Sequence, residues 1–437
     1  METRRIRIGL LGCGTVGTGV VRMIRANASA YSRRLGAPLE LSAIADRSLK
    51  PDPSLGVTRE LIVRDPIELV TRGDIDIVLE LFGDIEPALT LILKALDAGK
   101  DVVTANKALL ADSGQRIFRS AQKHGLAVGF EASVGGGIPI IRTLRESLAG
   151  DRQRTVYGIV NGTCNFILTT MSERGGEFAE ALAQAQGAGL AEANPSLDVD
   201  GHDTAHKLCL LVTLAFGAML RPSQVHTEGI TRITQRDIAY AREFGYAIKL
   251  LAIAKDDNGA IEARVHPTMI PAKHLLASVG GAFNAIYIHG EALGPTMYFG
   301  QGAGQMPSAT AVMADVLEVA RHRLTAGSSR PHALGYPVET IKRARVKPMD
   351  ELEGEYYLRF QVPDKPGVLG AIASVLGRNA ISIASMLQPE RGAEDTVPII
   401  MRTHEAIERN LKRALGEIRK LRLARGLPMF IWVEERL

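Results

Sequence analysis

Short apolar segments alternate with helical patterns through the first third of the chain. Strand-like runs occupy residues 5–11, 39–45, 75–81, 101–104 and 127–131, and helical patterns occupy residues 19–30, 87–98 and 114–124. Alternation of this kind is typical of a parallel sheet with right-handed helical crossovers. Residues 1–135 are therefore predicted to form a doubly wound α/β domain.

The pattern becomes less regular after residue 135. Residues 138–148 read as a helix and residues 155–160 as a strand, and the chain to about residue 299 mixes both types. An α+β domain over residues 136–327 is the resulting prediction. A strong helical pattern at residues 307–322 is expected to return to the first domain.

The last part of the chain reads as a separate compact unit. Residues 328–355 are rich in proline, glycine and charge, which predicts a linker. Strands are expected at residues 356–362, 381–388, 397–403 and 429–433, with helices after the first and third. The order βαββαβ over residues 356–437 is the ferredoxin-like split motif.

A dense cluster of charge precedes the longest apolar run. Glu192, Asp198, Asp200, Asp203 and Lys207 come directly before residues 208–220, whose uninterrupted apolar character indicates a buried helix. Asp203 and Lys207 stand four apart and share one face of that helix. The cluster either complements the helix dipole at the surface or forms an active site, and the local pattern leaves both interpretations open.

Composition narrows the class of protein. The 437 residues exceed the size of one core, and 46% hydrophobic with 23% charged residues is ordinary for a globular protein. The net charge of +4, without a basic tract interleaved with aromatics, argues against nucleic-acid binding. No apolar stretch reaches the ~20 residues of a membrane span, and three scattered cysteines predict neither disulfides nor a metal site. We expect a cytoplasmic protein without membrane partners.

The segment GCGTVG lies between the first strand and the first helix. Gly12, Gly14 and Gly17 fit the dinucleotide-binding turn, in which a helix N-terminus meets the pyrophosphate. Asp46 ends the second strand, where it would accept hydrogen bonds from a ribose, and Arg47 beside it could instead meet a 2′-phosphate. The choice between NADH and NADPH stays open.

Further polar residues follow the ends of apolar strands, where open α/β sheets place ligands. Thr104 and Lys107 follow one strand, and Glu131 ends another just before three consecutive glycines at residues 135–137. That glycine run is either a hinge or a place where carbonyls converge on a cation. The polar turn of Asn161, Gly162 and Thr163 either holds a small ligand or caps the next helix.

Taken together, these motifs resemble the homoserine dehydrogenase family. The resemblance rests on GCGTVG, TANKALL, EASVGGGIPI, NGTCNFI, AQGAGLAEANPSLDVDGHDTAHKL and GQGAGQMPSA. It implies a Rossmann-type cofactor domain and the reversible reduction of L-aspartate 4-semialdehyde to L-homoserine with NADPH or NADH, in threonine and methionine biosynthesis. A homodimer or homotetramer is expected. Bifunctional family members carry a kinase ahead of this region, so a monofunctional enzyme is expected here.

The resemblance also implies roles for individual residues. Lys207 matches the catalytic proton donor, Lys107 a lysine near the nicotinamide and substrate, and Glu192 and Asp203 the substrate contacts, with Asp198 close to them. The matched cofactor contacts are Thr15, Val16, Gly189 and Gly304. A site for a monovalent cation, Na⁺, matches Glu131, Val134, Gly136 and Ile138.

The C-terminal unit resembles an ACT domain, through FQVPDKPGVLGAIASVLGRNAISIASM. Its Pro-Asp-Lys-Pro-Gly turn offers free amides to an amino-acid carboxylate, which implies feedback regulation with threonine as the allosteric ligand. A purely structural or dimerising module is the alternative. Two other functions stay open for the whole chain, namely an amino-acid sensor with a vestigial dehydrogenase and a reductase of a related semialdehyde.

Overall fold

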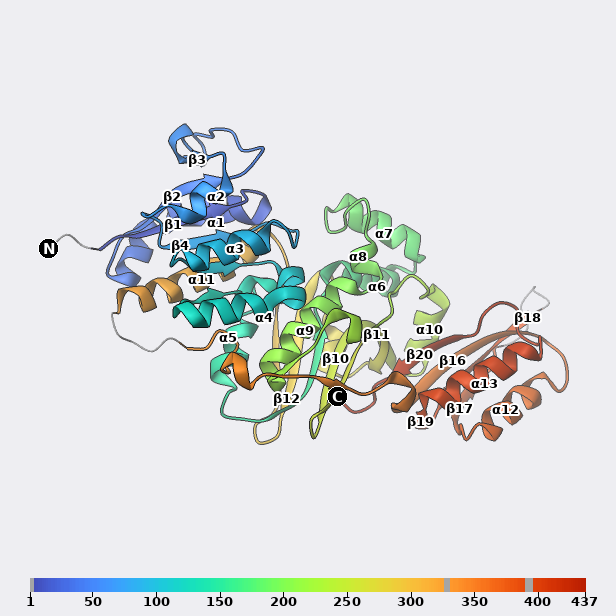
Figure 1. Ribbon diagram of the computed structural model, residues 1–437. Helices are drawn as coiled ribbons and strands as arrows, with labels where there is room; N and C mark the ends of the chain where they lie inside the picture. The colour runs from blue at the N-terminus through green and yellow to red at the C-terminus, as the bar shows by residue number, and fades with distance from the viewer. Residues whose placement is uncertain (1–3, 326–330, 390–395) are drawn as a thin grey trace. The chain divides into compact units, whose positions relative to one another are not determined.

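The computed structural model describes residues 4–325, 331–389 and 396–437, which divide into two compact units (Figure 1). The first unit comprises Met1–Gly162, Asp203–Val225 and Phe283–Ala344, and the second comprises Thr163–His202, His226–Ala282 and Arg345–Leu437. The start of the predicted linker, residues 328–330, lies outside the described residues. No helix in the described part of the chain has the length and apolar character that crossing a membrane requires.

A six-stranded parallel sheet forms the N-terminal part of the first unit, which confirms the predicted Rossmann-type fold. Its order is β3 (Ile62–Val63), β2 (Leu39–Ala45), β1 (Ile6–Leu11), β4 (Ile77–Glu80), β5 (Asp101–Thr104) and β6 (Val128–Gly129). From β1 the chain continues outward through β2 to β3 on one side, and from β4 it continues outward through β5 to β6 on the other. Ligands bind beyond the carboxyl ends of such strands, at the point where the order reverses.

Helices cover this sheet. They are α1 (Thr15–Leu35), α2 (Pro66–Thr71), α3 (Ala88–Asp97), α4 (Lys107–His124) and α11 (Gln305–Leu324). Figure 1 shows α11, in orange, among the blue elements although it comes far later in the chain. Ala309, Val312 and Val316 of α11 are buried in one core with Val20 and Ile24 of α1. The late helix thus completes the N-terminal core.

Two helices begin earlier than their apolar pattern predicted. Helix α1 begins at Thr15 instead of residue 19, because the dinucleotide turn leads directly into its first turn. Helix α4 begins at Lys107 instead of residue 114, because the side chain of Asn106 caps it by accepting a 3.1 Å hydrogen bond from Leu109 N. Lys107 is consequently the first residue of a helix, and its backbone is fixed.

The first unit also contains an antiparallel sheet of β7 (Gln153–Ile159), β12 (Phe283–Gly290) and β13 (Gly294–Gln301), with the buried helix α9 (His202–Phe216). The single helix predicted for residues 138–148 is instead a short helix α5 (Ile140–Arg142) followed by a π-helical turn, Thr143–Ser147. Glu131 accepts hydrogen bonds from two backbone amides of α5, Ile141 N and Arg142 N, so a side chain from an earlier segment holds the backbone just before the π-helical turn.

The second unit is built on a long antiparallel hairpin of β10 (Tyr246–Asp257) and β11 (Ala260–Pro271). Its helices are α6 (Gly162–Arg174), α7 (Phe178–Gly187), α8 (Ser196–Val199) and α10 (Gln235–Glu243). Three short strands complete its edges, namely β9 (His226–Thr227), β15 (Arg345–Val346) and β19 (Ala406–Ile407). In the first unit, β8 (Ala218–Met219) pairs with β14 (Lys342–Arg343), and β14 comes just before β15 in the chain.

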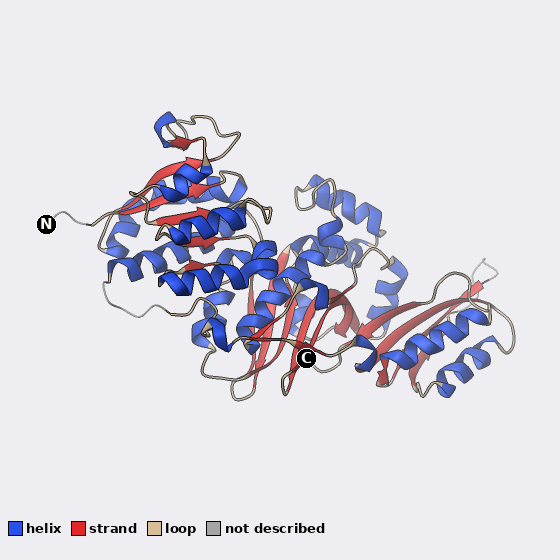
Figure 2. Cartoon of the chain, in the orientation of Figure 1, coloured by secondary structure: helices blue, strands red, loops and turns tan. Residues whose placement is uncertain are grey.

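The C-terminal module of the second unit confirms the predicted βαββαβ order. Its elements are β16 (Glu353–Pro363), α12 (Val368–Arg378), β17 (Ile383–Leu387), β18 (Thr396–Thr403), α13 (Glu408–Lys420) and β20 (Met429–Val433). Figure 2 shows its two helices side by side on the strands, and their apolar faces share one core with them. Strand β20 pairs in parallel with β11 through Thr268 and Trp432, so the module's sheet continues into the hairpin.

Candidate active site

Two residues of the charged cluster, Asp203 and Lys207, lie in the first turns of α9. Asp203 is 4% exposed and Lys207 8% exposed, and the Lys207 ammonium donates a 2.7 Å hydrogen bond to Asp203 Oδ2. A second hydrogen bond of 2.6 Å joins Lys207 Nζ to the carbonyl oxygen of Val160. The pair is therefore buried, unlike a surface charge cluster that complements a helix dipole.

Two further residues of the first unit meet the same carboxylate. Lys107 Nζ lies 3.1 Å from Asp203 Oδ1, and Asn161 Nδ2 donates a 2.9 Å hydrogen bond to Asp203 Oδ2. Lys107 arrives from the start of α4 and Asn161 from the turn after β7. Lys107, Asn161 and Lys207, which come from three separate segments of the sequence, thus surround the Asp203 carboxylate.

The charges of the two lysines determine the ionisation of Asp203. Burial by itself would raise the pKa of this carboxyl, but the positive charges of Lys207 and Lys107 and the hydrogen bonds from Lys207 and Asn161 hold the pKa below its ordinary value. Asp203 is therefore ionised at neutral pH. One negative and two positive charges leave the cluster with a net positive charge.

Lysine has three N–H donors, and the contacts given above use two of those on Lys207. The third is directed at neither Asp203 nor Val160. A donor held in this way, on a side chain fixed by two hydrogen bonds, suits proton transfer to a substrate oxygen. The arrangement can stabilise negative charge that develops on such an oxygen.

The glycine turn between β1 and α1 fits a dinucleotide. Gly12 has φ of +89°, and a side chain at Gly17 would lie 2.3 Å from the Gly12 carbonyl oxygen, so both positions require glycine. A Cβ at Gly14 would have no atom within 4 Å, which leaves open space at the N-terminus of α1. No side chain caps this helix, so its first amides, at Thr15 and Val16, can face a pyrophosphate.

A cavity of about 550 Å³ lies beside the end of β2. Asp46, Arg47, Ser48, Arg64, Phe82 and Gly83 are among its lining residues. The Asp46 carboxylate already accepts hydrogen bonds from Cys13 N, Ser48 N, Ser48 Oγ and Leu49 N. These bonds outweigh the effect of burial and lower the pKa of Asp46. Three of these bonds end on Oδ1 and one ends on Oδ2, so the protein uses most of the acceptor capacity of this carboxylate and Oδ2 keeps one acceptor position.

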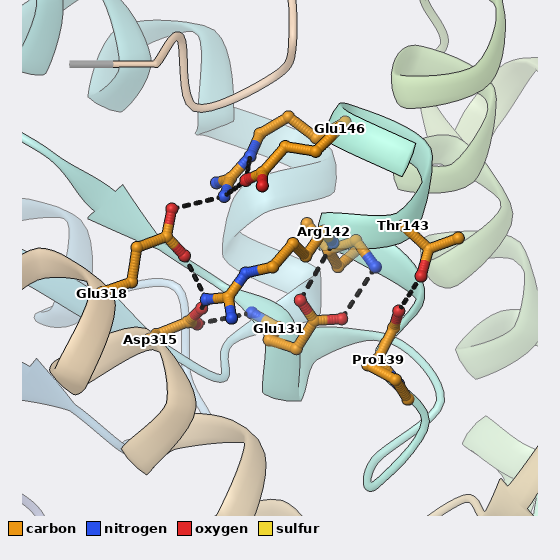
Figure 3. Close-up of polar contacts among 9 residues, drawn as sticks. Glu131, Pro139, Arg142, Thr143, Glu146, Asp315 and Glu318 are labelled. Carbon is orange, nitrogen blue, oxygen red and sulfur yellow. Dashed lines mark hydrogen bonds and ion pairs between the residues drawn. The ribbon is translucent and has the colours of Figure 1, made fainter. Parts of the chain in front are cut away.

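Glu131 forms a separate polar region of the first unit with Arg142, Asp315 and Glu318 (Figure 3), and the glycine run follows Glu131 in the chain. Both oxygens of Glu131 accept backbone amide bonds, of 2.8 Å from Ile141 N and 3.0 Å from Arg142 N. Asp315 of α11 accepts a 2.7 Å bond from Glu131 N, and burial together with the charge of Glu131 raises the pKa of Asp315 to about 8. Gly135 and Gly136 have positive φ, and a Cβ at Gly136 would lie 2.4 Å from Gly302 O. Val134 and Ile138 are buried beside them.

Other predicted site residues belong to the second unit. Glu192 is exposed and Asp198 half-buried, while Gly189 has φ of +70° in the turn after α7. Thr163 Oγ1 donates a 2.7 Å hydrogen bond to Leu190 O, so the polar turn at Gly162 and Thr163 holds the loop that carries Glu192. Gly304, in the first unit, precedes α11 with φ of +126°.

Sequence reasoning missed three groups. Arg64 lines the cavity but follows β3, a strand of two residues that is too short to show a period. The Val160 carbonyl is a backbone group and leaves no trace in the sequence. Glu80 is the only acidic residue of β4 and ends that apolar strand. Glu131 was selected because it ends an apolar strand, and the same pattern could have selected Glu80. Thr104, predicted to contact the cofactor, donates its hydroxyl to Glu80.

Comparisons with known proteins agree with this geometry. The family described as homoserine dehydrogenase matches residues 139–317, the family described as homoserine dehydrogenase, NAD binding domain, matches residues 12–131, and the ACT domain family matches residues 356–423. The chain is 44% identical to a homoserine dehydrogenase of Neisseria gonorrhoeae over 416 residues, which are 95% of each protein. A Pseudomonas aeruginosa relative of the same name is 41% identical over 431 residues, 98% of this chain and 99% of that protein.

Solved structures give the same result. A homoserine dehydrogenase from Thiobacillus denitrificans superposes with a TM-score of 0.92 at 42% identity, covering 99% of both chains. A hyperthermophilic archaeal homoserine dehydrogenase in complex with NADPH superposes with a TM-score of 0.64 at 26% identity, covering 75% of this chain and all of that one. Full-length identity above 40% and the buried lysine–carboxylate cluster lead to one conclusion: the chain belongs to the homoserine dehydrogenase family, oxidoreductases with a nicotinamide-binding domain.

Proposed function

We propose that the cluster of Asp203, Lys207 and Lys107 is the centre at which L-aspartate 4-semialdehyde is reduced to L-homoserine. The observation that carries this proposal is one buried carboxylate held between two lysine ammonium groups. Reduction of an aldehyde places negative charge on its oxygen, and a nearby fixed cation stabilises that charge. The reverse reaction uses the same groups.

The chain's own residues have distinct roles in this step. The bound nicotinamide cofactor supplies the hydride equivalent to the aldehyde carbon. Lys207 donates a proton to the aldehyde oxygen, with Val160 and Asp203 fixing the position of its ammonium. Lys107 adds a second positive charge, and Asp203 orients both lysines. We expect Glu192 and Asp198 to bind the substrate ammonium.

An assay of NADPH oxidation with aspartate 4-semialdehyde tests these roles. Lys207→Met should lower kcat by about 10²–10⁴-fold, the usual contribution of a general acid. Lys123→Met, an exposed lysine at the end of α4, is the matched control and should keep wild-type kcat. Wild-type activity in Lys207→Met, or a wild type that reduces only another semialdehyde, would refute the proposal.

For the cofactor we propose a preference for NADPH. Arg47 and Arg64 line the cavity beside Asp46, and the oxygens of Asp46 are largely occupied by protein donors, so the cavity suits a 2′-phosphate better than a ribose hydroxyl. Replacing both arginines by alanine should raise the KM for NADPH about 10–100-fold, and change the KM for NADH little. Arg59→Ala, on the same loop but outside the cavity lining, serves as control. Equal effects on both cofactors would exclude this preference.

Threonine is the proposed ligand of the C-terminal module, as a feedback regulator of threonine and methionine biosynthesis. Gly367, at φ of +87°, leads into α12, and no side chain caps that helix, so its first amides suit an amino-acid carboxylate. L-Threonine should lower the rate of NADPH oxidation and raise Tm, and D-threonine should do neither. An unchanged rate and Tm at saturating L-threonine would leave the module a structural one.

A Na⁺ site and oligomeric assembly complete the proposal. The conformation of Gly135 and Gly136, with Glu131 close by in the chain, suits carbonyl coordination of a monovalent cation. Activity in NaCl should exceed activity in choline chloride of equal ionic strength. We further propose a cytoplasmic homodimer or homotetramer, which sedimentation of the purified enzyme distinguishes from a monomer.

A further inference from the structure

Glu80 is a fully buried carboxylic acid that the reaction described above does not use. It is the last residue of β4, with no exposed surface, and is paired in register with Thr104 of β5. A buried carboxylate is costly unless its oxygens are hydrogen-bonded. Its presence at the ligand-binding edge of the sheet therefore requires an explanation.

Both oxygens of Glu80 accept a hydrogen bond. Thr104 Oγ1 donates to Oε2 over 2.5 Å, and Phe82 N donates to Oε1 over 2.8 Å. Each of these two donors lies close in the chain to a residue or cavity of the proposed active site. Phe82 lines the cofactor cavity, and Thr104 comes three residues before Lys107.

The Thr104 hydroxyl carries the connection onward. Because its single proton points at Glu80, its oxygen is left to accept a 3.0 Å hydrogen bond from Asn106 N. The Asn106 side chain caps α4 through Leu109 N and also donates a 2.8 Å bond to the Asp84 carbonyl. Helix α4 therefore starts at a point set by a continuous chain of bonds from Glu80, and its first residue is Lys107.

The position of Lys107 matters because its ammonium reaches the catalytic carboxylate. Its Nζ lies 3.1 Å from Asp203 Oδ1, and the Lys107 side chain is about one-third exposed. Its own packing thus restrains it only in part. A shift at the first turn of α4 would move the ammonium away from Asp203.

We propose that Glu80 is a positioning residue, which fixes the direction of the Thr104 hydroxyl and, through Asn106, the placement of Lys107 against Asp203. This inference rests on the proposed role of Lys107 and adds to it a residue that touches neither substrate nor cofactor. Burial raises the pKa of Glu80 to about 7, and the bonds from Thr104 and Phe82 partly offset this rise.

A double-mutant cycle tests the proposal. Glu80→Gln keeps the shape of the side chain. Its amide nitrogen is a donor, however, and would face either the Thr104 hydroxyl or Phe82 N, both of which donate to Glu80. We expect a loss in kcat of roughly 10-fold, the scale of a displaced catalytic group. If Glu80 acts through Lys107, the Glu80→Gln/Lys107→Met enzyme should have the same kcat as Lys107→Met alone.

Two controls make the outcome specific. Glu408→Gln changes another buried glutamate, in the C-terminal module, and should leave kcat unchanged. Thr104→Val removes the same connection without touching Glu80, so it replaces Glu80→Gln if that variant does not fold. Thr104→Ser retains the hydroxyl and should keep more of kcat than Thr104→Val.

The possible failures are distinguishable. Two results would overturn the positioning role alone. One is a double variant in which the two losses in kcat multiply. The other is an unchanged kcat in both Glu80→Gln and Thr104→Val while Lys107→Met is impaired. Wild-type kcat in Lys107→Met would overturn the proposed role of that lysine and this inference with it.

Discussion

Lys207 lies one helical turn after Asp203 on α9, and its ammonium donates a 2.7 Å hydrogen bond to Oδ2 of that carboxylate. Because both side chains are almost fully buried, neither charge can be moved without affecting the other. The contacts of this pair hold the Lys207 ammonium, a hydrogen-bond donor, in a fixed position.

Replacing Asp203 by asparagine should lower kcat by about 10²-fold, since the neutral amide leaves two ammonium groups without their counter-charge. Steady-state kinetics with aspartate 4-semialdehyde measures this loss. Asp200→Asn makes the same chemical change three residues earlier, at a position with no assigned role, and should behave as wild type. If Asp203→Asn retains wild-type kcat, its carboxylate does not organise the lysines.

The two glycines of the dinucleotide turn should respond differently to alanine. Gly17→Ala would place Cβ 2.3 Å from the Gly12 carbonyl oxygen and should destabilise the fold by about 1–3 kcal/mol. Gly14→Ala meets no protein atom within 4 Å and should keep wild-type stability, but weaken cofactor binding. Urea denaturation and fluorescence titration with NADPH separate the two effects. Equal cofactor affinity in Gly14→Ala and wild type would show that the pyrophosphate does not approach Gly14.

Lys249 of β10 provides a pH-dependent test of stability. Its ammonium is buried and bonds to Val279 O over 2.6 Å, and burial lowers its pKa from 10.5 to about 8. The unfolded chain therefore binds more protons than the folded chain between about pH 8 and 10.5, and this group makes stability rise with pH across that interval.

Lys249→Met removes this dependence. The difference in unfolding free energy between the variant and the wild type has a pH-dependent part of roughly 3 kcal/mol. This part favours the variant below pH 8 and disappears as pH approaches 10.5. Val279 O keeps a 3.1 Å bond from Asn165 Nδ2, while Asn165 Oδ1 loses the 3.3 Å bond that it accepts from Lys249 Nζ, a loss that does not depend on pH. Unfolding free energies at several pH values measure the difference, with the exposed Lys273→Met as control. A difference that stays constant from pH 7 to 10 would contradict the lowered pKa.

Asp237 and Arg359 join α10 to the C-terminal module within the second unit. Arg359 Nε donates over 2.7 Å to the buried Asp237 carboxylate, which also caps α10 through Thr234. Arg359→Met should cost about 3–5 kcal/mol, because it leaves a buried charge unpaired, and Arg359→Met/Asp237→Leu should recover part of that cost. Chemical denaturation provides the measurement. A double variant less stable than Arg359→Met would mean that the capping role of Asp237 outweighs its charge.

Local periodicity was sufficient for much of the fold. The boundaries of β2, β5 and β20 agree with their predictions, because a strand with a buried face carries that burial as a run or period of apolar residues. The start of α4 was missed, since its cap depends on Asn106 and on hydrogen bonds to Asp84 and Thr104, which lie on other elements. The π-helical turn at Thr143–Ser147 was missed for the same reason, since Glu131 holds the backbone before it.

The sequence by itself determined the element order, the dinucleotide turn and the family, because these depend on local patterns and on motifs of neighbouring residues. Only the tertiary structure decided that Lys107 and Asn161 meet Asp203, that the Val160 carbonyl holds Lys207, and that Arg64 joins Arg47 in the cavity beside Asp46. The physical reason is that these contacts join residues far apart in the chain. Such contacts exist only after sheet and helices have packed, and no apolar period along the chain records them.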